Sequence, residues 1–272
     1  MSYILPNLDD TASVIHSIEA NTAEFLLVMG KAGGGEERCS DSITWTIGGS
    51  PIDYHNAVVH ANLSVNDADQ VIRDVVAKFK AHRVPGSWHL GPSMQPVDLG
   101  QRLMAQGFTS GGGEPGMAAF LPALNEQIST PLGFMVERVR DETQLALWAR
   151  TLAVDFGEGE REANWVAEVY RKIGLGDDVP WRHYLGHLDS EPVATSSMFL
   201  GAGVAGIYFV LTVPHARGRG IGAAITLAAL RDARDRGYRV GVLGASEPGF
   251  PVYERLGFRQ YCDFTIYEWH PT

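Results

Sequence analysis

The sequence predicts an α/β protein built of two tandem domains. Three observations lead to this expectation: the length of the chain, a repeated order of strands and helices, and a constant offset between the two repeats. A chain of 272 residues is long enough for two domains of ordinary size. Its composition, 45% hydrophobic and 20% charged, is that of a globular protein and argues against a disordered chain.

The first half of the chain alternates strands and helices. Its clearest helix is Asp67–His82, where helical spacing places Val71, Ile72, Val75 and Phe79 on one face. Apolar runs bounded by turn-forming residues are expected to be strands. The remaining expected elements are strands at Phe25–Val28, Ser42–Ile47, Asn56–Leu63 and Trp88–Leu90 and a second helix at Pro96–Met104.

The second half repeats this order. Its expected elements are a strand at Gly206–Val213, a helix at Gly222–Arg236, a strand at Tyr238–Leu243 and a helix through Tyr253–Leu256. The segment Leu90 to Ser93 aligns with Leu243 to Ser246, and Arg102 aligns with Arg255, both at an offset of 153 residues. Several matches at one offset indicate that the two halves are copies of one structural unit.

The boundary between the copies is expected within Pro122–Pro131, a polar connection with proline at both ends. Beyond it, Gly133–Val139 reads as a new strand and Asp141 as the start of a helix. We therefore assign residues 1–124 to a first domain and residues 132–272 to a second.

Charge and cysteine content restrict the possible partners. The formal net charge of −10 opposes binding to nucleic acid or to an anionic membrane surface. No run of apolar residues is long enough for a membrane span, and the N-terminal stretch lacks a basic segment typical of a signal peptide. Cys39 and Cys262 have neither a metal-ligand spacing nor the density of a disulfide framework. We expect a cytoplasmic protein without a metal site.

A glycine-rich loop in the second copy suits a phosphate group. It runs from Arg217 to Gly222, between an apolar strand and a helix. Glycines there let the backbone turn tightly and present N–H groups at a helix N-terminus, where the helix dipole favours an anion. Arg217 and Arg219 add cationic donors, as a pyrophosphate requires. The loop has the spacing of neither an ATP-binding Walker motif nor a dinucleotide fingerprint.

This pattern resembles a known family. Arg217-x-x-Gly220-x-Gly222, preceded by Val213-Pro214, resembles the acetyl-CoA pyrophosphate motif of the GCN5-related N-acetyltransferase (GNAT) superfamily. Later in the chain, Tyr253-Glu-Arg-Leu-Gly-Phe258 resembles the stretch that carries the family's usual catalytic tyrosine. The resemblance covers residues from about Gly133 to Trp269 and implies two tandem GNAT-like domains, each a mixed twisted sheet flanked by helices.

The resemblance also implies a cofactor and a set of contacts. Acetyl-CoA would be the co-substrate, with its pantetheine arm on backbone groups of the strand that precedes the loop, where the sheet is splayed. Ser246 stands at a position that is often asparagine in the family. The residues expected to bind the cofactor are Leu211, Thr212, Val213, Arg217, Gly218, Arg219, Gly220, Ile221, Gly222 and Ser246.

The first copy lacks these features. At the offset of 153 residues, Asn66–Asp69 aligns with Arg219–Gly222, so both glycines are replaced. Asp67 and Asp69 would occupy the positive end of the helix dipole and repel a pyrophosphate. Gly100 aligns with Tyr253, so the tyrosine is missing as well. We expect the first domain to be a degenerate copy without a cofactor site.

The function expected from the resemblance is direct transfer of an acetyl group to an amine of a small molecule or peptide. Tyr253 is the expected general acid, because a phenol can protonate the thiolate that leaves. No general base is assigned; Glu160, Glu162, Tyr208, His215 and Glu247 are conceivable, as is bound water.

Two other functions remain open. One is a CoA-binding or sensing module that has lost its chemistry, since the strand before the loop carries no carboxylate. The other is a tandem acyltransferase that uses charged transfer RNA, although this would require neither the glycine loop nor an acidic chain. His183 and His187 have the spacing of a helical metal pair, but Tyr184, Leu185 and Gly186 favour a strand there, so no metal is assigned.

Overall fold

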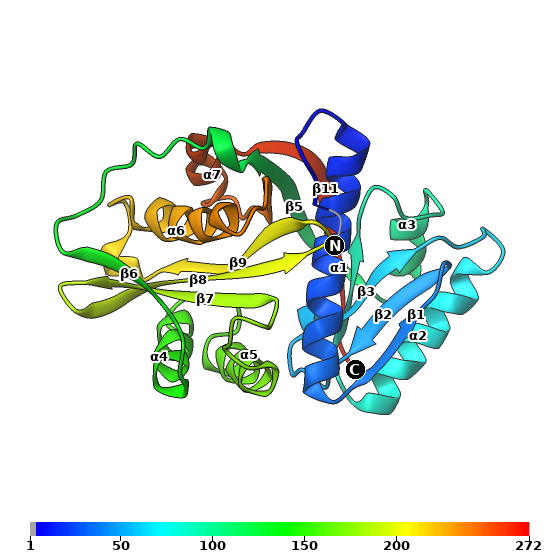
Figure 1. Cartoon of the computed structure of the whole chain (residues 1–272). Coiled ribbons are helices and arrows are strands. Elements are labelled where there is room, and N and C mark those ends of the chain that lie inside the picture. Colours follow the sequence, from blue (N-terminus) through cyan, green and yellow to red (C-terminus); the bar gives the residue numbers. More distant parts are fainter. Residues whose placement is uncertain (1–3, 272) are drawn as a thin grey trace. The chain divides into compact units, whose positions relative to one another are not determined.

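The computed structural model describes residues 4–271 and contains two compact units (Figure 1). The C unit comprises the chain up to Asn21 together with Pro115–Tyr261, and the N unit comprises Thr22–Glu114 together with the residues from Cys262 onwards. Each unit is a mixed β-sheet with helices packed on it. The α/β class and the tandem organisation are those expected from the sequence.

In the C unit, the strand order is β5-β10-β9-β8-β7-β6. Only β9 and β10 run parallel; the other neighbours are antiparallel. Helices α4 and α5 lie on one side of strands β7 to β9, and α6 lies on the other (Figure 1). The bounds are β5 Thr109–Phe120, η2 Leu121–Ala123, β6 Phe134–Arg138, α4 Glu142–Leu152, α5 Glu160–Ile173, β7 Trp181–Leu188, β8 Glu191–Gly201, β9 Val204–Thr212, η3 Pro214–Ala216, α6 Ile221–Asp235, β10 Val240–Gly244 and α7 Phe250–Leu256.

In the N unit, the strand order is β1-β2-β3-β4-β11. Strands β3 and β4 are the parallel pair, and α2 packs its apolar face, including Ile72 and Phe79, into the core of this unit. The bounds are α1 Thr11–Gly33, which begins in the C unit, β1 Glu36–Cys39, β2 Ile43–Ile47, η1 Asp53–His55, β3 Asn56–Ala61, α2 Ala68–His82, β4 Gly86–Leu90, α3 Leu99–Ala105 and β11 Arg259–Trp269.

The structure agrees with the internal repeat. Shifted by 153 residues, the bounds of α2 coincide with those of α6. The parallel pair β3 and β4 brackets α2 in the same way that β9 and β10 bracket α6. The glycine loop and its first-copy counterpart therefore stand at equivalent positions, each at the start of the helix that crosses between two parallel strands.

The last strand of each copy is exchanged. β5 follows α3 in the first copy, yet its residues Gly116–Phe120 pair with β10 of the second. β11 follows α7 in the second copy, yet Thr265–Trp269 pair with β4 of the first. For this reason the compact units change over within β5 and β11, at residues 114–115 and 261–262; a further change lies within α1, at residues 21–22.

One expected strand is a helix. Phe25–Val28 lies within α1, because the apolar run belongs to a longer helical stripe of buried residues at Val14, Ile18, Phe25 and Met29. A four-residue window does not reveal this period. The other expected elements are present, with bounds shifted by a few residues, and Asp141 caps α4 by accepting the N–H of Gln144 at 2.8 Å.

His183 and His187 both lie on β7, as the strand-like residues between them indicated. No helix between residues 4 and 271 combines the length and the apolar character that crossing a bilayer requires.

Candidate functional site

The sheet of the C unit opens next to the glycine loop. β9 and β10 are paired only at Ala205 with Gly241 and at Gly206 with Val242. β9 then continues to Thr212, paired with β8 alone. Within residues 4–271, the edge of β9 from Ile207 onwards therefore has no β10 partner. Such an edge offers backbone groups to a ligand that contains amides.

A β-bulge accompanies this opening. The register between β8 and β9 shifts between Thr195 and Ser197, and Phe209 has a φ of +52°. The hydroxyl of Thr195 donates a hydrogen bond to the carbonyl oxygen of Phe209 at 2.9 Å, which holds the bulge. A bulge bends its strand, which accounts for the divergence of β9 from β10. Nothing in the sequence around Phe209 indicated it.

The three residues expected to meet the pantetheine arm lie at the end of β9. Leu211 and Val213 have buried side chains, and Thr212 is half-buried. Two of their backbone groups are already engaged: the N–H of Val213 donates to the carbonyl of Val193 at 2.9 Å, and the carbonyl of Thr212 accepts from Nε of Arg217 at 2.9 Å. On its other edge β9 is paired with β8 here, Leu211 with Thr195 and Thr212 with Ala194.

The glycine loop leads directly into α6. Gly218 and Gly220 have φ values of +73° and +80°, in the left-handed region that favours glycine. A Cβ atom on Gly220 would also lie 2.0 Å from the carbonyl oxygen of Ser129. Among the described residues, the N–H groups of residues 218–223 have no acceptor. Several unpaired donors at a helix N-terminus form a cradle for an anion.

The two arginines of the loop differ in their surroundings. Arg217 is tied down, because its guanidinium donates to Thr212 and also to the carboxylate of Asp155 in the loop between α4 and α5. Its side chain nevertheless stays half exposed. Arg219 is exposed and has no hydrogen bond or ion pair within residues 4–271. The involvement of Asp155 could not be foreseen from its position in the sequence.

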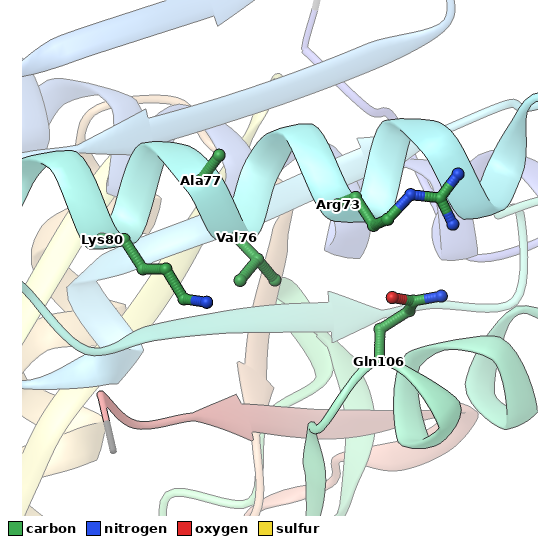
Figure 2. Close-up of a pocket in the computed structure, with 5 residues that line it drawn as sticks. All are labelled: Arg73, Val76, Ala77, Lys80 and Gln106. Atoms are coloured by element: carbon green, nitrogen blue, oxygen red, sulfur yellow. The ribbon is translucent and has the colours of Figure 1, made fainter.

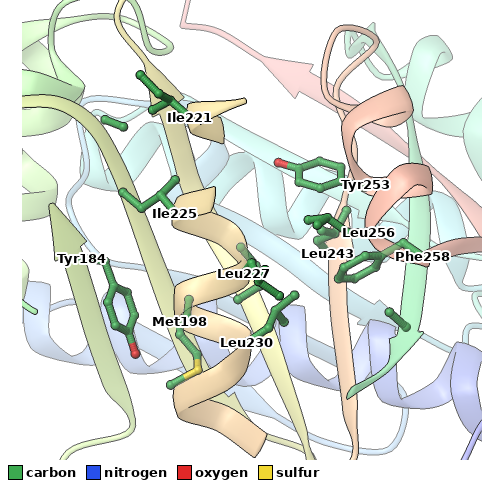
Figure 3. Packing of buried hydrophobic residues seen from close by; sticks show 14 of the residues in the cluster. Tyr184, Met198, Ile221, Ile225, Leu227, Leu230, Leu243, Tyr253, Leu256 and Phe258 are labelled. Atoms are coloured by element: carbon green, nitrogen blue, oxygen red, sulfur yellow. The ribbon is translucent and has the colours of Figure 1, made fainter. Parts of the chain in front are cut away.

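Tyr253 and Ser246 come together around one glycine. A Cβ atom on Gly249 would lie 2.9 Å from Cε2 of Tyr253 and 3.1 Å from Oγ of Ser246. The ring of Tyr253 packs near that of Phe258, with 5.9 Å between centroids, and its hydroxyl is directed away from α7 toward the side of Ile221 (Figure 3). Burial raises the pKa of Tyr253 to about 12. The phenol is therefore a protonated donor at neutral pH.

The five conceivable general bases include three carboxylates, and none of these three belongs to β9. The five residues are Glu160, Glu162, Tyr208, His215 and Glu247. Glu162 is buried and accepts the N–H of Glu158 at 3.2 Å, so it serves the start of α5. The hydroxyl of Tyr208 donates to Asn21 at 2.7 Å. His215 lies 3.4 Å from Glu191 at the surface. The other two, Glu160 and Glu247, are partly or fully exposed.

The equivalent positions of the N unit are filled by the protein's own side chains. At the start of α2, Asp69 pairs with Arg102 at 2.8 Å, and Asp67 accepts from the hydroxyl of Ser64 at 2.7 Å. A Cβ atom on Gly100, the counterpart of Tyr253, would lie 2.3 Å from the hydroxyl of Tyr267. These side chains occupy the positions at which the second copy has the glycine loop and Tyr253.

An open hollow in the N unit is unrelated to these residues. It lies between α2 and the end of α3 and is lined by Arg73, Val76, Ala77, Lys80 and Gln106 (Figure 2). Its two cations are separated along α2 by Val76 and Ala77, and Arg73 already donates to Gln70.

Comparison with known proteins gives a match in the region of the loop. Residues 202–261 match the family model described as an acetyltransferase (GNAT) domain, which covers β9, α6, β10 and α7. The mycothiol acetyltransferase of Saccharomonospora viridis is 41% identical over 68 residues, which is 24% of this chain and 22% of that protein. The mycothiol acetyltransferase of Thermomonospora curvata is 28% identical over 156 residues, 53% of this chain and 50% of that protein. The matches thus span half or less of these relatives.

Solved structures with the same fold cover most of the chain. A GCN5-related N-acetyltransferase from Kribbella flavida superposes with a TM-score of 0.71 at 16% identity, over 92% of this chain and 96% of that one. A tandem GNAT protein from the clavulanic acid biosynthesis pathway has a TM-score of 0.57 at 14% identity, over 88% of this chain and 80% of that one. The expected fold of two tandem GNAT-like domains is confirmed.

Proposed function

We propose that this chain, with an acetyltransferase (GNAT) domain at residues 202–261 and the fold of the GCN5-related N-acetyltransferases, moves an acetyl group from acetyl-CoA to an amine of a small molecule or peptide. The observation that carries this proposal is the cradle of unpaired N–H groups at the start of α6, directly after an unpaired edge of β9. Together they suit a ligand with a pyrophosphate at one end and amides along its arm.

The loop residues would bind and orient the donor. The N–H groups of Gly218, Gly220 and Gly222 and the side chains of Arg217 and Arg219 would hold the pyrophosphate. Leu211 and Thr212 would pair with the pantetheine arm, next to Ser246 on the far side of the opening. Acetyl-CoA supplies a thioester carbonyl that is activated toward an amine.

Tyr253 would complete the transfer. When the amine attacks the carbonyl carbon and the C–S bond breaks, the sulfur leaves as a thiolate and needs a proton. Burial keeps the Tyr253 hydroxyl protonated, so it can supply that proton. The amine would lose its own proton to bound water, because Glu162, Tyr208 and His215 are engaged with other groups.

A CoA-sensing module is the second candidate, and the missing general base favours it. A single set of assays separates the two. Calorimetry should give one CoA site per chain, and Gly222→Asp, at a position that has room for a Cβ atom, should abolish binding while the fold, followed by circular dichroism, is kept. Acetyl-CoA is then assayed for thiol release against a panel of amines that includes the acceptor of the mycothiol acetyltransferases.

Thiol release that depends on one amine supports the transferase. Binding without release for any amine supports the sensor. No binding, or two sites per chain, contradicts both.

We place the protein in the cytoplasm, with no nucleic-acid or membrane partner; the exposed free thiol of Cys39 suits a reducing compartment.

A further inference from the structure

A cluster of potential metal ligands lies in the N unit, outside the acetyl-transfer site. Asp53 belongs to η1, Glu268 is near the end of β11, and His270 follows that strand. One ligand atom from each side chain lies within 4.8 Å of the other two. Because 215 residues separate Asp53 from Glu268, no spacing rule applied to the sequence could have found this set.

The backbone holds two of these residues in place. Glu268 pairs with Ser87 of β4 in the sheet register, and the hydroxyl of Ser87 donates to the carbonyl oxygen of Asp53 at 3.0 Å. Oδ1 of Asp53 accepts the N–H of Tyr54 at 2.7 Å, which fixes the carboxylate. Its other oxygen, Oδ2, lies 3.4 Å from Nε2 of His270. The site is thus built on a strand pair and a short helix, not on flexible side chains alone.

The carboxylate of Glu268 has no hydrogen bond or ion pair within residues 4–271. It occupies space that Gly111 leaves free, since a Cβ atom there would lie 2.1 Å from Oε1 of Glu268. Two carboxylates held this close repel each other unless a cation lies between them.

We propose that Asp53, Glu268 and His270 bind a divalent transition-metal ion of the Zn²⁺ class. One imidazole nitrogen and two carboxylate oxygens are typical ligands of Zn²⁺ and its neighbours, whereas Ca²⁺ and Mg²⁺ prefer oxygen alone. Three atoms at most 4.8 Å apart leave a point about 2.8 Å from each, and Zn²⁺ ligands lie at about 2.0–2.2 Å. Side-chain rotations that move the ligand atoms of the exposed His270 and of Glu268 by less than about 1 Å bring them to this ligand distance. Water molecules complete the coordination.

The bound ion would link Glu268 of β11 and His270 after it to Asp53 of η1, and would so stabilise the N unit. This role is independent of acetyl transfer, so its failure would leave the proposed function untouched.

Zn²⁺ binding by the full chain tests the proposal. The protein carries Cys39→Ser, to remove an exposed cysteine that would compete for Zn²⁺, has no affinity tag and is dialysed against EDTA. Competition with a chromogenic chelator should then give one equivalent of bound Zn²⁺. Glu268→Gln and His270→Gln should each weaken binding at least about tenfold. His82→Gln is the matched control, because His82 is an exposed histidine of the same unit that pairs with a single carboxylate, Glu36.

A second measurement covers variants that lose stability. Zn²⁺ should raise the melting temperature of the parent protein and of His82→Gln but not that of His270→Gln. Because the side chain of His270 is largely exposed, metal-free His270→Gln should have the same melting temperature as the metal-free parent. Less than one equivalent in the parent, or equal affinity in His270→Gln and the parent, overturns the proposal.

Discussion

Arg217 and Asp155 form an ion pair that links the loop before α6 to the loop between α4 and α5. Both side chains are about half exposed, at 51% and 50%, so the pair contributes little to stability. Its significance lies in competition: the carboxylate of Asp155 occupies donors of Arg217 that a pyrophosphate would use. The pair thus opposes binding of the anion that the loop is proposed to hold.

Asp155→Asn is therefore expected to tighten CoA binding, by up to about fivefold, which is the range of an exposed ion pair. Calorimetric titration of CoA measures this, and the gain should shrink as salt is added, because salt screens the pair in the parent protein. Asp235→Asn, the same charge change at the opposite end of α6, should leave the affinity unchanged. Weaker binding in Asp155→Asn would mean that Asp155 positions Arg217 and does not compete for it.

The glycines of the loop should differ in their effect on stability. Gly220→Ala combines a φ of +80° with a Cβ 2.0 Å from Ser129, so we expect it to lose more than about 1–2 kcal/mol. Gly218→Ala has the strained φ but open space, so it should lose only about 1 kcal/mol. In Gly222→Ala the Cβ would lie 3.4 Å from Oγ1 of Thr212, an ordinary contact. Urea unfolding should rank the three in that order, with Gly222→Ala close to the parent.

Gly222→Ala then tests the cradle itself. Because the protein accommodates the added methyl group, any loss of CoA affinity reports on the approach of a ligand to the backbone of α6. We expect a loss of at least about tenfold by calorimetry, since each charge-assisted hydrogen bond to an anion is worth about 1.5–3 kcal/mol. Unchanged affinity would move the pyrophosphate away from Gly222.

Tyr253→Phe should separate binding from chemistry. The phenol would act only on the leaving thiolate, so CoA affinity should stay within about twofold while kcat falls by about 10–1,000-fold. With a pKa of about 12, Tyr253 does not ionise in an ordinary assay, so a loss of kcat below pH 10 must come from another group. Phe258→Leu, which removes the neighbouring ring instead, should change kcat far less. Full activity in Tyr253→Phe would make Tyr253 a packing residue.

Acid should destabilise the protein through His183. This side chain is 1% exposed, and burial, with smaller effects from Arg138 and Arg182, lowers its pKa to about 3 from 6.5. The unfolded state therefore binds a proton that the folded state refuses, so stability present above pH 6.5 is lost as the pH falls toward 3.

In His183→Gln, the free energy of unfolding should depend less on pH between 6.5 and 4 than in the parent, as urea titrations at several pH values can measure. The exposed His16, changed in the same way, should leave the pH dependence intact. An unchanged slope in His183→Gln would mean that another group takes up the proton.

Local patterns were enough to predict much of this fold. The 3.6-residue period predicted α2 and α6 nearly to the residue, and turn-forming glycines marked the loop before α6. Tyr253 and Ser246 were chosen by motif, and the structure brings both to Gly249. These features depend on residues that are neighbours in the chain.

The features that sequence reasoning missed depend on distant partners. A strand such as β5 shows the same apolar pattern whether it pairs with β4 or with β10, so its exchange with β11 left no signal. The bulge at Phe209 is held by Thr195 of another strand, and Arg217 is held by Asp155 of another loop. The sequence did not predict α1, because the four residues Phe25–Val28 contain only part of its helical stripe.

The strand exchange predicts how fragments of the chain behave. A fragment of residues 132–261 lacks β5, so the edge of β10 at Val240–Gly244 would be left unpaired in the sheet of the C unit. An exposed apolar edge of this kind promotes aggregation. A fragment of residues 115–261 keeps Gly116–Phe120 and should be markedly more soluble, although both lack the segment before Asn21. Soluble yield and size-exclusion profiles compare the two. Equal solubility would mean that β5 contributes little to the stability of the C unit. The exchange of β5 and β11 would then not make one copy depend on the other.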